Sequence, residues 1–133
     1  MLGNAVINLY ADTDFFLALI KKDDWLKKNA EKIYKKYKNE LWTSTLTLKE
    51  LLLMAYRDNK DPTEIIERAA ELMEIKEPNI GVEGHIAACY LIKKYQMTPF
   101  DALHAVLCEN DTIVSSDKKY DMLGLNRIKL EKE

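Results

Sequence analysis

Four acidic residues stand where a secondary-structure element of this chain is predicted to begin or end. Asp12 and Asp117 each follow an apolar β-prone run, Asp101 opens a helical pattern, and Glu50 lies near the start of another. Two carboxylates about 4 Å apart repel each other by roughly 4 kcal/mol at an effective dielectric near 20. Several that meet must therefore share protons or bind a cation, and binding a cation is the commoner outcome.

A site made of carboxylate oxygens suits Mg²⁺ or Mn²⁺. Either ion acidifies a bound water and offsets the negative charge that a phosphodiester acquires during hydrolysis. Cys89 and Cys108 lie in helical apolar patterns without a CxxC spacing, so they suggest no competing zinc site. The acids therefore favour metal-dependent phosphodiester hydrolysis over a chance arrangement of surface carboxylates.

Two of these acids are positioned by one strand and one helix. Thr98 fits an N-cap and Pro99 the first helical position, which places Asp101 in the first turn of a helix. A short β-prone run at 112–114 follows and ends in the polar segment Ser115 to Asp117. A buried parallel strand that ends in polar residues is where open α/β sheets place their ligands.

The rest of the chain alternates between strand and helix patterns. The other predicted strands are 5–11, 41–44, one around Ile75 and an edge strand at 126–130. The other predicted helices are one after Asp14, one over 25–38 that Asp24 caps, one capped by Thr45 or Thr47, one that begins at Asp61 and Pro62, one over 82–95 and a single turn at 120–123. This order predicts an α/β fold with a mainly parallel sheet, in a single domain over residues 1–133. Strand ends and helix starts gather at one edge of such a sheet, so the acids should converge.

Composition limits the class of protein. The chain has 133 residues, 47% hydrophobic and 32% charged, with a formal net charge of −2. It is therefore expected to fold as a globular domain and not to be a globally basic nucleic-acid binder. No run approaches the about 20 apolar residues that span a bilayer, and no secretory signal precedes the first strand, so a cytoplasmic location without membrane contact is expected. The following lysines remain to be tested as a phosphate track: Lys27, Lys28, Lys35, Lys36 and Lys38.

Four segments, LYADTDFFLALI, STLTLKELLL, MTPFDALHAVLC and IVSSDKKYD, resemble the acidic motifs of PIN-domain nucleases, the family that includes VapC-type toxins. The resemblance implies a three-layer α/β/α domain and an endoribonuclease that requires Mg²⁺ or Mn²⁺. It also implies that Asp12, Asp101 and Asp117 hold the metal directly. Glu50 would bind the metal or its water.

The resemblance implies further roles for neighbouring residues. Ser115 would orient nearby groups, and Thr13 completes the Asp-Thr pair of the first motif. Asp14 and Asp121 are extra acids expected around the metal or at a second metal. Histidine side chains ordinarily titrate near neutrality, so His104 could serve as a general base, but in this pattern it is expected to pack structurally.

The resemblance also implies three partners. RNA would be the substrate, a small antitoxin would occlude the acidic cleft with a basic side chain, and a second copy of the chain would form a homodimer. The apolar face of the helix from Trp25 to Tyr37 is the surface that we expect to form this dimer.

Two alternatives compete with the nuclease. A haloacid-dehalogenase-like phosphatase would use Asp12 and Asp14 in its first motif, but Phe16 stands where threonine or valine is expected, and Glu50 and Asp101 would have no task. It would pass through an aspartyl phosphate at Asp12. The other alternative is a catalytically silent PIN-like module that only binds RNA or a protein.

Overall fold

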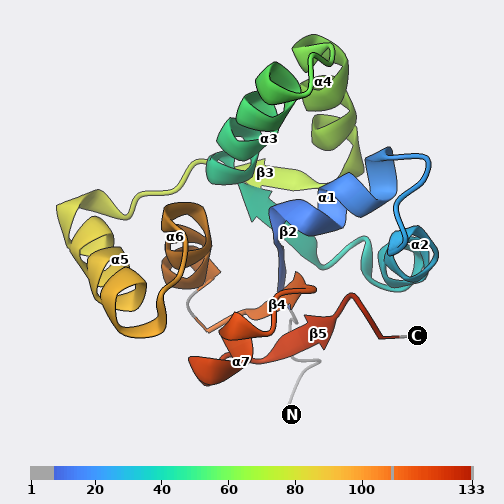
Figure 1. The fold of residues 1–133 in the computed structure, drawn as a ribbon. Helices are drawn as coiled ribbons and strands as arrows, with labels where there is room; N and C mark the ends of the chain where they lie inside the picture. The colour runs from blue at the N-terminus through green and yellow to red at the C-terminus, as the bar shows by residue number, and fades with distance from the viewer. Residues whose placement is uncertain (1–7, 109, 133) are drawn as a thin grey trace.

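The computed structural model describes residues 8–108 and 110–132, and its centre is a five-stranded, wholly parallel sheet (Figure 1). The strands are β1 (Leu9–Ala11), β2 (Leu41–Ser44), β3 (Glu74–Lys76), β4 (Thr112–Ser115) and β5 (Arg127–Lys129), in the order β3-β2-β1-β4-β5. The predicted parallel sheet is confirmed. Of the first strand, predicted over 5–11, residues 5–7 lie outside the described part of the chain.

Helices cover both faces of the sheet, which confirms the three-layer arrangement. They are α1 (Thr13–Ile20), α2 (Lys27–Tyr37), α3 (Thr45–Arg57), α4 (Pro62–Leu72), α5 (Gly81–Tyr95), α6 (Pro99–Cys108) and the short α7 (Lys119–Met122). In Figure 1, α5 and α6 lie on one side of the sheet and α1 and α2 on the other, while α3 and α4 lie near β3. Within the described ranges, no helix has the length and apolar character needed to cross a bilayer.

The central strands alternate between two hydrophobic cores. Leu9 and Ala11 of β1 and Val114 of β4 pack in the core that α1 to α4 complete. Tyr10 and Ile113 point the other way, into the core formed with α5 and α6. Because both faces of the sheet are buried, β1 and the middle of β4 are apolar, as expected for internal parallel strands.

Helix starts were predicted closely where an Asp-Pro pair or a Thr-Pro pair marks them, and less closely elsewhere. Asp61 caps α4 as predicted, with its side chain accepting from the Thr63 N–H at 3.0 Å. The predicted cap of α3, Thr45 or Thr47, was wrong. Ser44 caps it, because β2 runs into α3 without a loop, and its Oγ accepts from the Leu46 N–H at 3.3 Å.

The apolar face of α2 packs within its own domain. Ala30 and Ile33 are buried in the core, and the Tyr34 hydroxyl donates to the Leu72 carbonyl at 2.5 Å. Our expectation that this face forms a dimer was therefore wrong. Its hydrophobic pattern is explained by contacts with α1 and with the end of α4.

Candidate active site

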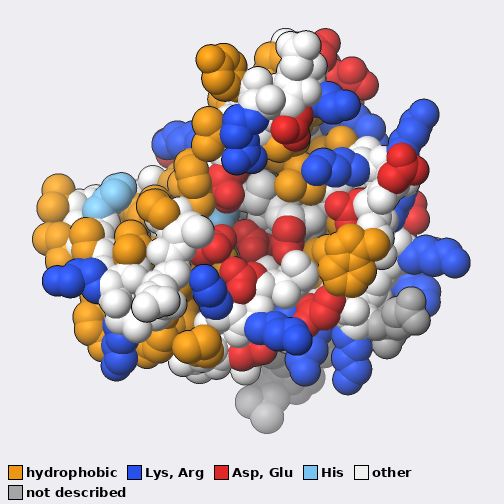
Figure 2. Space-filling view, in the orientation of Figure 1, with side chains coloured by type: hydrophobic (Ala, Val, Ile, Leu, Met, Phe, Trp, Pro, Cys, Tyr) orange, Lys and Arg blue, Asp and Glu red, His pale blue; other side chains and the backbone are white. Residues whose placement is uncertain are grey.

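The acidic residues lie at the point where the chain changes direction within the sheet. From β1, the chain continues through α1 and α2 to β2 on one side, whereas β4 pairs with β1 on the other side. Loops diverge at such a point and leave a crevice at the carboxyl ends of the two strands. Asp12 directly follows β1, and Asp117 lies two residues beyond β4. Figure 2 shows Asp and Glu side chains gathered near the middle of this face, with Lys and Arg side chains around them.

Asp12 is fixed at the bottom of the site. It is the N-cap of α1 and only 5% exposed. Its Oδ1 accepts from the Thr13 N–H at 2.8 Å, and its Oδ2 accepts from the Ser115 hydroxyl at 2.7 Å. The Ser115 Oγ in turn accepts from the Asp117 N–H at 3.0 Å. Ser115 thus joins the ends of β1 and β4, a contact suited to the orienting role expected for it.

Glu50 reaches the same place from the second turn of α3. Its Oε1 accepts from the Thr13 hydroxyl at 2.6 Å and lies 2.5 Å from Nε2 of His104. Its side chain is 22% exposed, so it forms the wall of the site and not its floor. Thr13 therefore links Asp12, through its backbone, to Glu50, through its side chain.

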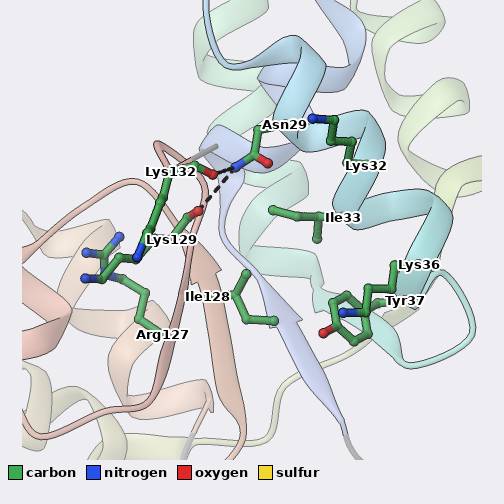
Figure 3. Close-up of a pocket in the computed structure, with 9 residues that line it drawn as sticks. All are labelled: Asn29, Lys32, Ile33, Lys36, Tyr37, Arg127, Ile128, Lys129 and Lys132. Atoms are coloured by element: carbon green, nitrogen blue, oxygen red, sulfur yellow. Dashed lines mark hydrogen bonds between the residues drawn. The ribbon is translucent and has the colours of Figure 1, made fainter.

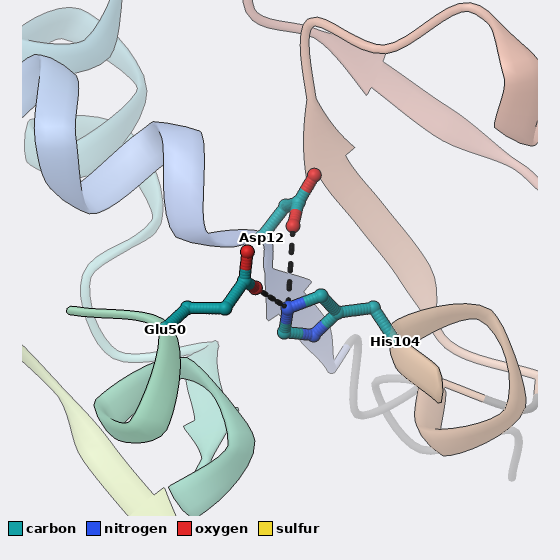
Figure 4. Close-up of side chains that lie close together, drawn as sticks. All are labelled: Asp12, Glu50 and His104. Atoms are coloured by element: carbon teal, nitrogen blue, oxygen red, sulfur yellow. Dashed lines mark hydrogen bonds and ion pairs between the residues drawn. The ribbon is translucent and has the colours of Figure 1, made fainter. Parts of the chain in front are cut away.

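His104 is more than the packing residue that the sequence suggested. Its side chain is fully buried beneath the acids, with Nε2 3.6 Å from Oδ1 of Asp12 (Figure 4). On its other side, Nδ1 lies 2.6 Å from the Tyr10 hydroxyl, which is 2.8 Å from the Ser44 Oγ. One ligand atom from each of Asp12, Glu50 and His104 lies within 4.8 Å of the other two. The contacts at both ring nitrogens fix the orientation of the His104 imidazole.

The remaining acids line the same crevice. Asp14 accepts through Oδ2 from the Ser116 N–H at 2.9 Å and from its hydroxyl at 2.5 Å, while its buried Oδ1 has no partner among the described residues. Asp101 lies in the first turn of α6, with Oδ1 3.5 Å from the Tyr120 hydroxyl. Asp117 Oδ1 accepts from the backbone of the following turn.

The pKa values of these carboxyl groups are raised in part by the charges of their neighbours. Burial, with the charge of Asp101 added, raises the pKa of Asp12 despite its hydrogen bonds. Burial and then the charge of Asp12 raise the pKa of Asp14 to about 7. Burial, followed by the charges of Asp117 and Glu50, also raises the pKa of Asp101. The acids predicted from the sequence are therefore close enough to repel one another.

The buried histidine responds in the opposite sense. Burial alone would lower the pKa of His104, but the hydrogen bond to Glu50 and the charges of Asp12, Glu50 and Asp101 outweigh it and raise the pKa above its ordinary value. No lysine or arginine of the described residues forms an ion pair with these acids. His104 is thus the one described cation that offsets them.

This donor set fits a divalent cation. Several carboxylates converge above His104, their negative charge is incompletely offset, and one buried carboxylate oxygen of Asp14 has no partner among the described residues. Oxygen ligands of this kind suit Mg²⁺ or Mn²⁺. The structure brings Glu50 and His104 closest to Asp12, while Asp101 and Asp117 join the site through their charges.

Asp121 lies apart from this cluster. Its carboxylate is 46% exposed and pairs with the Arg127 guanidinium at 2.9 Å. This ion pair, and not burial, lowers the pKa of Asp121. None of its contacts joins it to the acids of the site, so the structure gives no support to the place near the metal that we expected for it.

Three residues of the site escaped sequence reasoning: Tyr10, Ser116 and Tyr120. Tyr10 and Tyr120 are fully buried with hydroxyls directed at His104 and Asp101, and Ser116 holds Asp14. A signal existed for Tyr10, because a tyrosine in a buried strand needs a partner for its hydroxyl. No comparable signal marked the other two.

The structure is a three-layer α/β domain with a parallel sheet, and its acids lie where the strand order of the sheet reverses. The chain belongs to the PIN domain family, whose model matches residues 9–124. This assignment agrees with the motif resemblance and not with the phosphatase alternative. A search of curated proteins gave no match.

Solved structures share the fold at low sequence identity. VapC20 of Mycobacterium tuberculosis, titled a Sarcin-Ricin loop cleaving toxin, has a TM-score of 0.75 at 14% identity, over 92% of this chain and 99% of that one. A toxin-antitoxin complex from Klebsiella pneumoniae has a TM-score of 0.68 at 14% identity, over 95% and 99%. VapBC-1 from nontypeable Haemophilus influenzae has a TM-score of 0.68 at 19% identity, over 95% and 100%.

Proposed function

We propose that this protein is a Mg²⁺- or Mn²⁺-dependent endoribonuclease and the toxin of a toxin-antitoxin pair. The observation that carries the proposal is the cluster of mutually repelling carboxylates at the switch point, where the pKa of Asp14 is raised to about 7. Membership of the PIN domain family and the titles of the similar structures, which name toxins, support it.

Asp12, Asp101 and Asp117 would hold the ion, with Glu50 binding it or its water. When bound, the ion would supply a water of lowered pKa and offset charge on the phosphodiester. The protein's own contribution is to fix these groups beforehand. Thr13 and Ser115 hold the Asp12 carboxylate from both oxygens, and His104 and Thr13 hold Glu50, so little reorganisation is needed during the reaction.

Metal removal tests this proposal. Protein treated with EDTA is expected to cleave no RNA, and added Mg²⁺ or Mn²⁺ should restore cleavage, measured on labelled RNA in a gel. Calorimetric titration with Mn²⁺ alone should show binding, because His104 is the one described cation among several acids and leaves part of their charge unpaired. Equal cleavage with and without EDTA would contradict metal dependence, and binding of RNA and Mn²⁺ without any cleavage would favour the silent module.

An antitoxin is the proposed protein partner. It would insert a basic side chain into the acidic crevice, where His104 is the one cation that the described residues supply. The similar Klebsiella pneumoniae structure is titled a toxin-antitoxin complex, which supports a partner of this kind.

A homodimer is also proposed, through α5 and not through α2. Val82, Ile86 and Tyr90 are spaced four residues apart along α5, so they lie on one face of the helix. Their side chains are 73%, 63% and 56% exposed, and an exposed apolar face of this kind is typical of an interface. Ile86→Glu is therefore expected to convert a dimer to a monomer in sedimentation, because it buries a charge in the interface. Tyr34→Glu would instead disturb the core beneath α2. A dimer that survives Ile86→Glu would exclude this face.

A further inference from the structure

A basic groove lies between α2 and β5, outside the acidic site (Figure 3). It has a volume of about 410 Å³. Lys32 and Lys36 line it from α2, and Lys129 and Lys132 line it from β5 and the residue segment that follows. We call it the α2–β5 groove. Ile33 lies between its two walls, so its base is apolar and its rim is charged.

The charge of this groove is only partly offset, since Lys129 is the one lysine of its lining that helps to lower the pKa of a described carboxyl group, that of Asp121. All four lysines are exposed, and none forms an ion pair within residues 8–108 and 110–132. Arg127 also lines the groove, but its guanidinium already binds Asp121 and Glu131. No described carboxylate side chain lines the groove. In a chain with net charge −2, such a concentration of like charge marks a binding surface for a polyanion.

The two walls of the groove are held together. The Asn29 side-chain amide, at the start of α2, donates to the Leu130 carbonyl at 2.7 Å and also to the carbonyls of Lys129 and Lys132. This amide fixes the beginning of α2 against the end of β5. The hydrogen bonds of this amide keep the two walls of the groove at a fixed separation.

The groove begins one strand away from the acidic site. Lys129 of β5 is the register partner of Ser115 of β4, whose hydroxyl holds the Asp12 carboxylate. Adjacent strands lie about 4.8 Å apart. An extended anion that occupies the groove can therefore continue over the end of β4 toward Asp12.

We propose that the α2–β5 groove binds the phosphate backbone of single-stranded RNA that extends from the cleavage site. The choice of RNA and the position of the cleaved bond rest on the proposed function, whereas the groove itself does not. A repeating row of phosphates matches the exposed lysines that line the groove, and Tyr37 adds an aromatic ring to the lining. An acidic protein segment is the competing ligand, and RNA is favoured over it because a metal ion bound by the acids of the site would accept a phosphate where the groove leads.

The test compares two double variants of α2. Lys32→Gln with Lys36→Gln removes charge from the groove, whereas Lys35→Gln with Lys38→Gln removes the same charge from the helix and its C-cap, outside the groove. Fluorescence anisotropy with labelled poly(U), in EDTA and over a range of salt, measures binding without cleavage. The groove variant should bind more weakly, and the slope of log K against log salt should become shallower by about 1.4, since each lost phosphate contact changes it by about 0.7. The control variant should keep the wild-type slope.

Each result has one meaning. Equal losses in both double variants would overturn the groove, because the effect would be one of overall charge. If polyglutamate competes with poly(U) and its affinity falls equally in the groove variant, RNA is not the specific ligand and the proposal fails. If wild type cleaves RNA but the groove variant binds poly(U) as tightly as wild type, the groove proposal is refuted and the nuclease proposal is not. Groove-dependent binding without cleavage in Mg²⁺ or Mn²⁺ would support the groove and refute the nuclease.

Discussion

Asp12→Asn is expected to lower the rate of metal-dependent RNA cleavage by roughly 10³-fold while the protein stays folded. Asp12 is the acid that both strand ends hold, through the Thr13 N–H and the Ser115 hydroxyl. Asparagine removes the negative charge and presents an NH₂ group to one of these two donors. The group proposed to hold the ion is then lost, and the orientation of its neighbours is disturbed.

The stability of the Asp12→Asn variant should not fall along with its activity. Burial raises the pKa of Asp12, so its charge is a cost to the metal-free folded state, and a neutral amide removes that cost. Thermal unfolding followed by circular dichroism should therefore give a midpoint near that of wild type, or above it, without metal. Calorimetry should show weakened Mn²⁺ binding in the same variant.

Asp121→Asn is the matched control. It makes the same chemical change in an acid that pairs with Arg127 at the exposed edge of β5, where an ion pair contributes up to about 1 kcal/mol. Cleavage should stay close to wild type. Full activity in Asp12→Asn would remove Asp12 from the site, and lost activity in folded Asp121→Asn would restore the role near the metal that the structure does not support.

Local signals explain why much of the fold was predictable. Asp61 before Pro62, and Thr98 before Pro99, combine a side-chain acceptor with a residue that needs no N–H, so the starts of α4 and α6 follow from two residues each. The apolar runs of β1 and β4 end in acids, and a parallel sheet brings such ends together. This rule is why Asp12, Asp101 and Asp117 were predicted to lie near one another, and their charges do interact in the structure.

What the sequence could not show depends on contacts between distant residues. Tyr10 and His104 are far apart in the chain, and their hydrogen bond depends on the direction of two side chains between β1 and α6. Ser116 and Asp14 meet for the same reason. The error at α2 has a different origin. Periodicity shows that Ile33 and Tyr34 share an apolar face, but not whether the protein's own core or a partner covers it.

Asp14→Asn is expected to stabilise the metal-free protein at pH 8 and to leave its stability at pH 4 nearly unchanged. Burial, followed by the charge of Asp12, raises the pKa of Asp14 from 3.8 to about 7 in the folded state. Below pH 4 both the folded and unfolded states carry the proton, so the group contributes no difference. As the pH rises from 4 to 7, the unfolded state releases the proton first, and stability falls.

Above pH 7 the whole penalty is present, and it is on the order of 4 kcal/mol at most. Asparagine cannot ionise, and its carbonyl can still accept from the Ser116 N–H, so the variant should recover about 2 to 4 kcal/mol at pH 8. Urea unfolding in EDTA at pH 4, 6 and 8 measures the free energy at each pH. The same decline with pH in wild type and variant would show that Asp14 is not its source.

Metal should stabilise wild type more than it stabilises Asp14→Asn. A divalent ion that binds only the folded state stabilises it in proportion to the logarithm of its concentration relative to its Kd. In wild type at pH 8, Mg²⁺ offsets the repulsion between Asp14, Asp12 and Asp117, so the gain in the free energy of unfolding should be large. In Asp14→Asn part of that repulsion is already gone, and the gain should be smaller. The pH dependence of folding would then have the same origin as metal binding, namely carboxylates that the fold holds closer together than their charges favour.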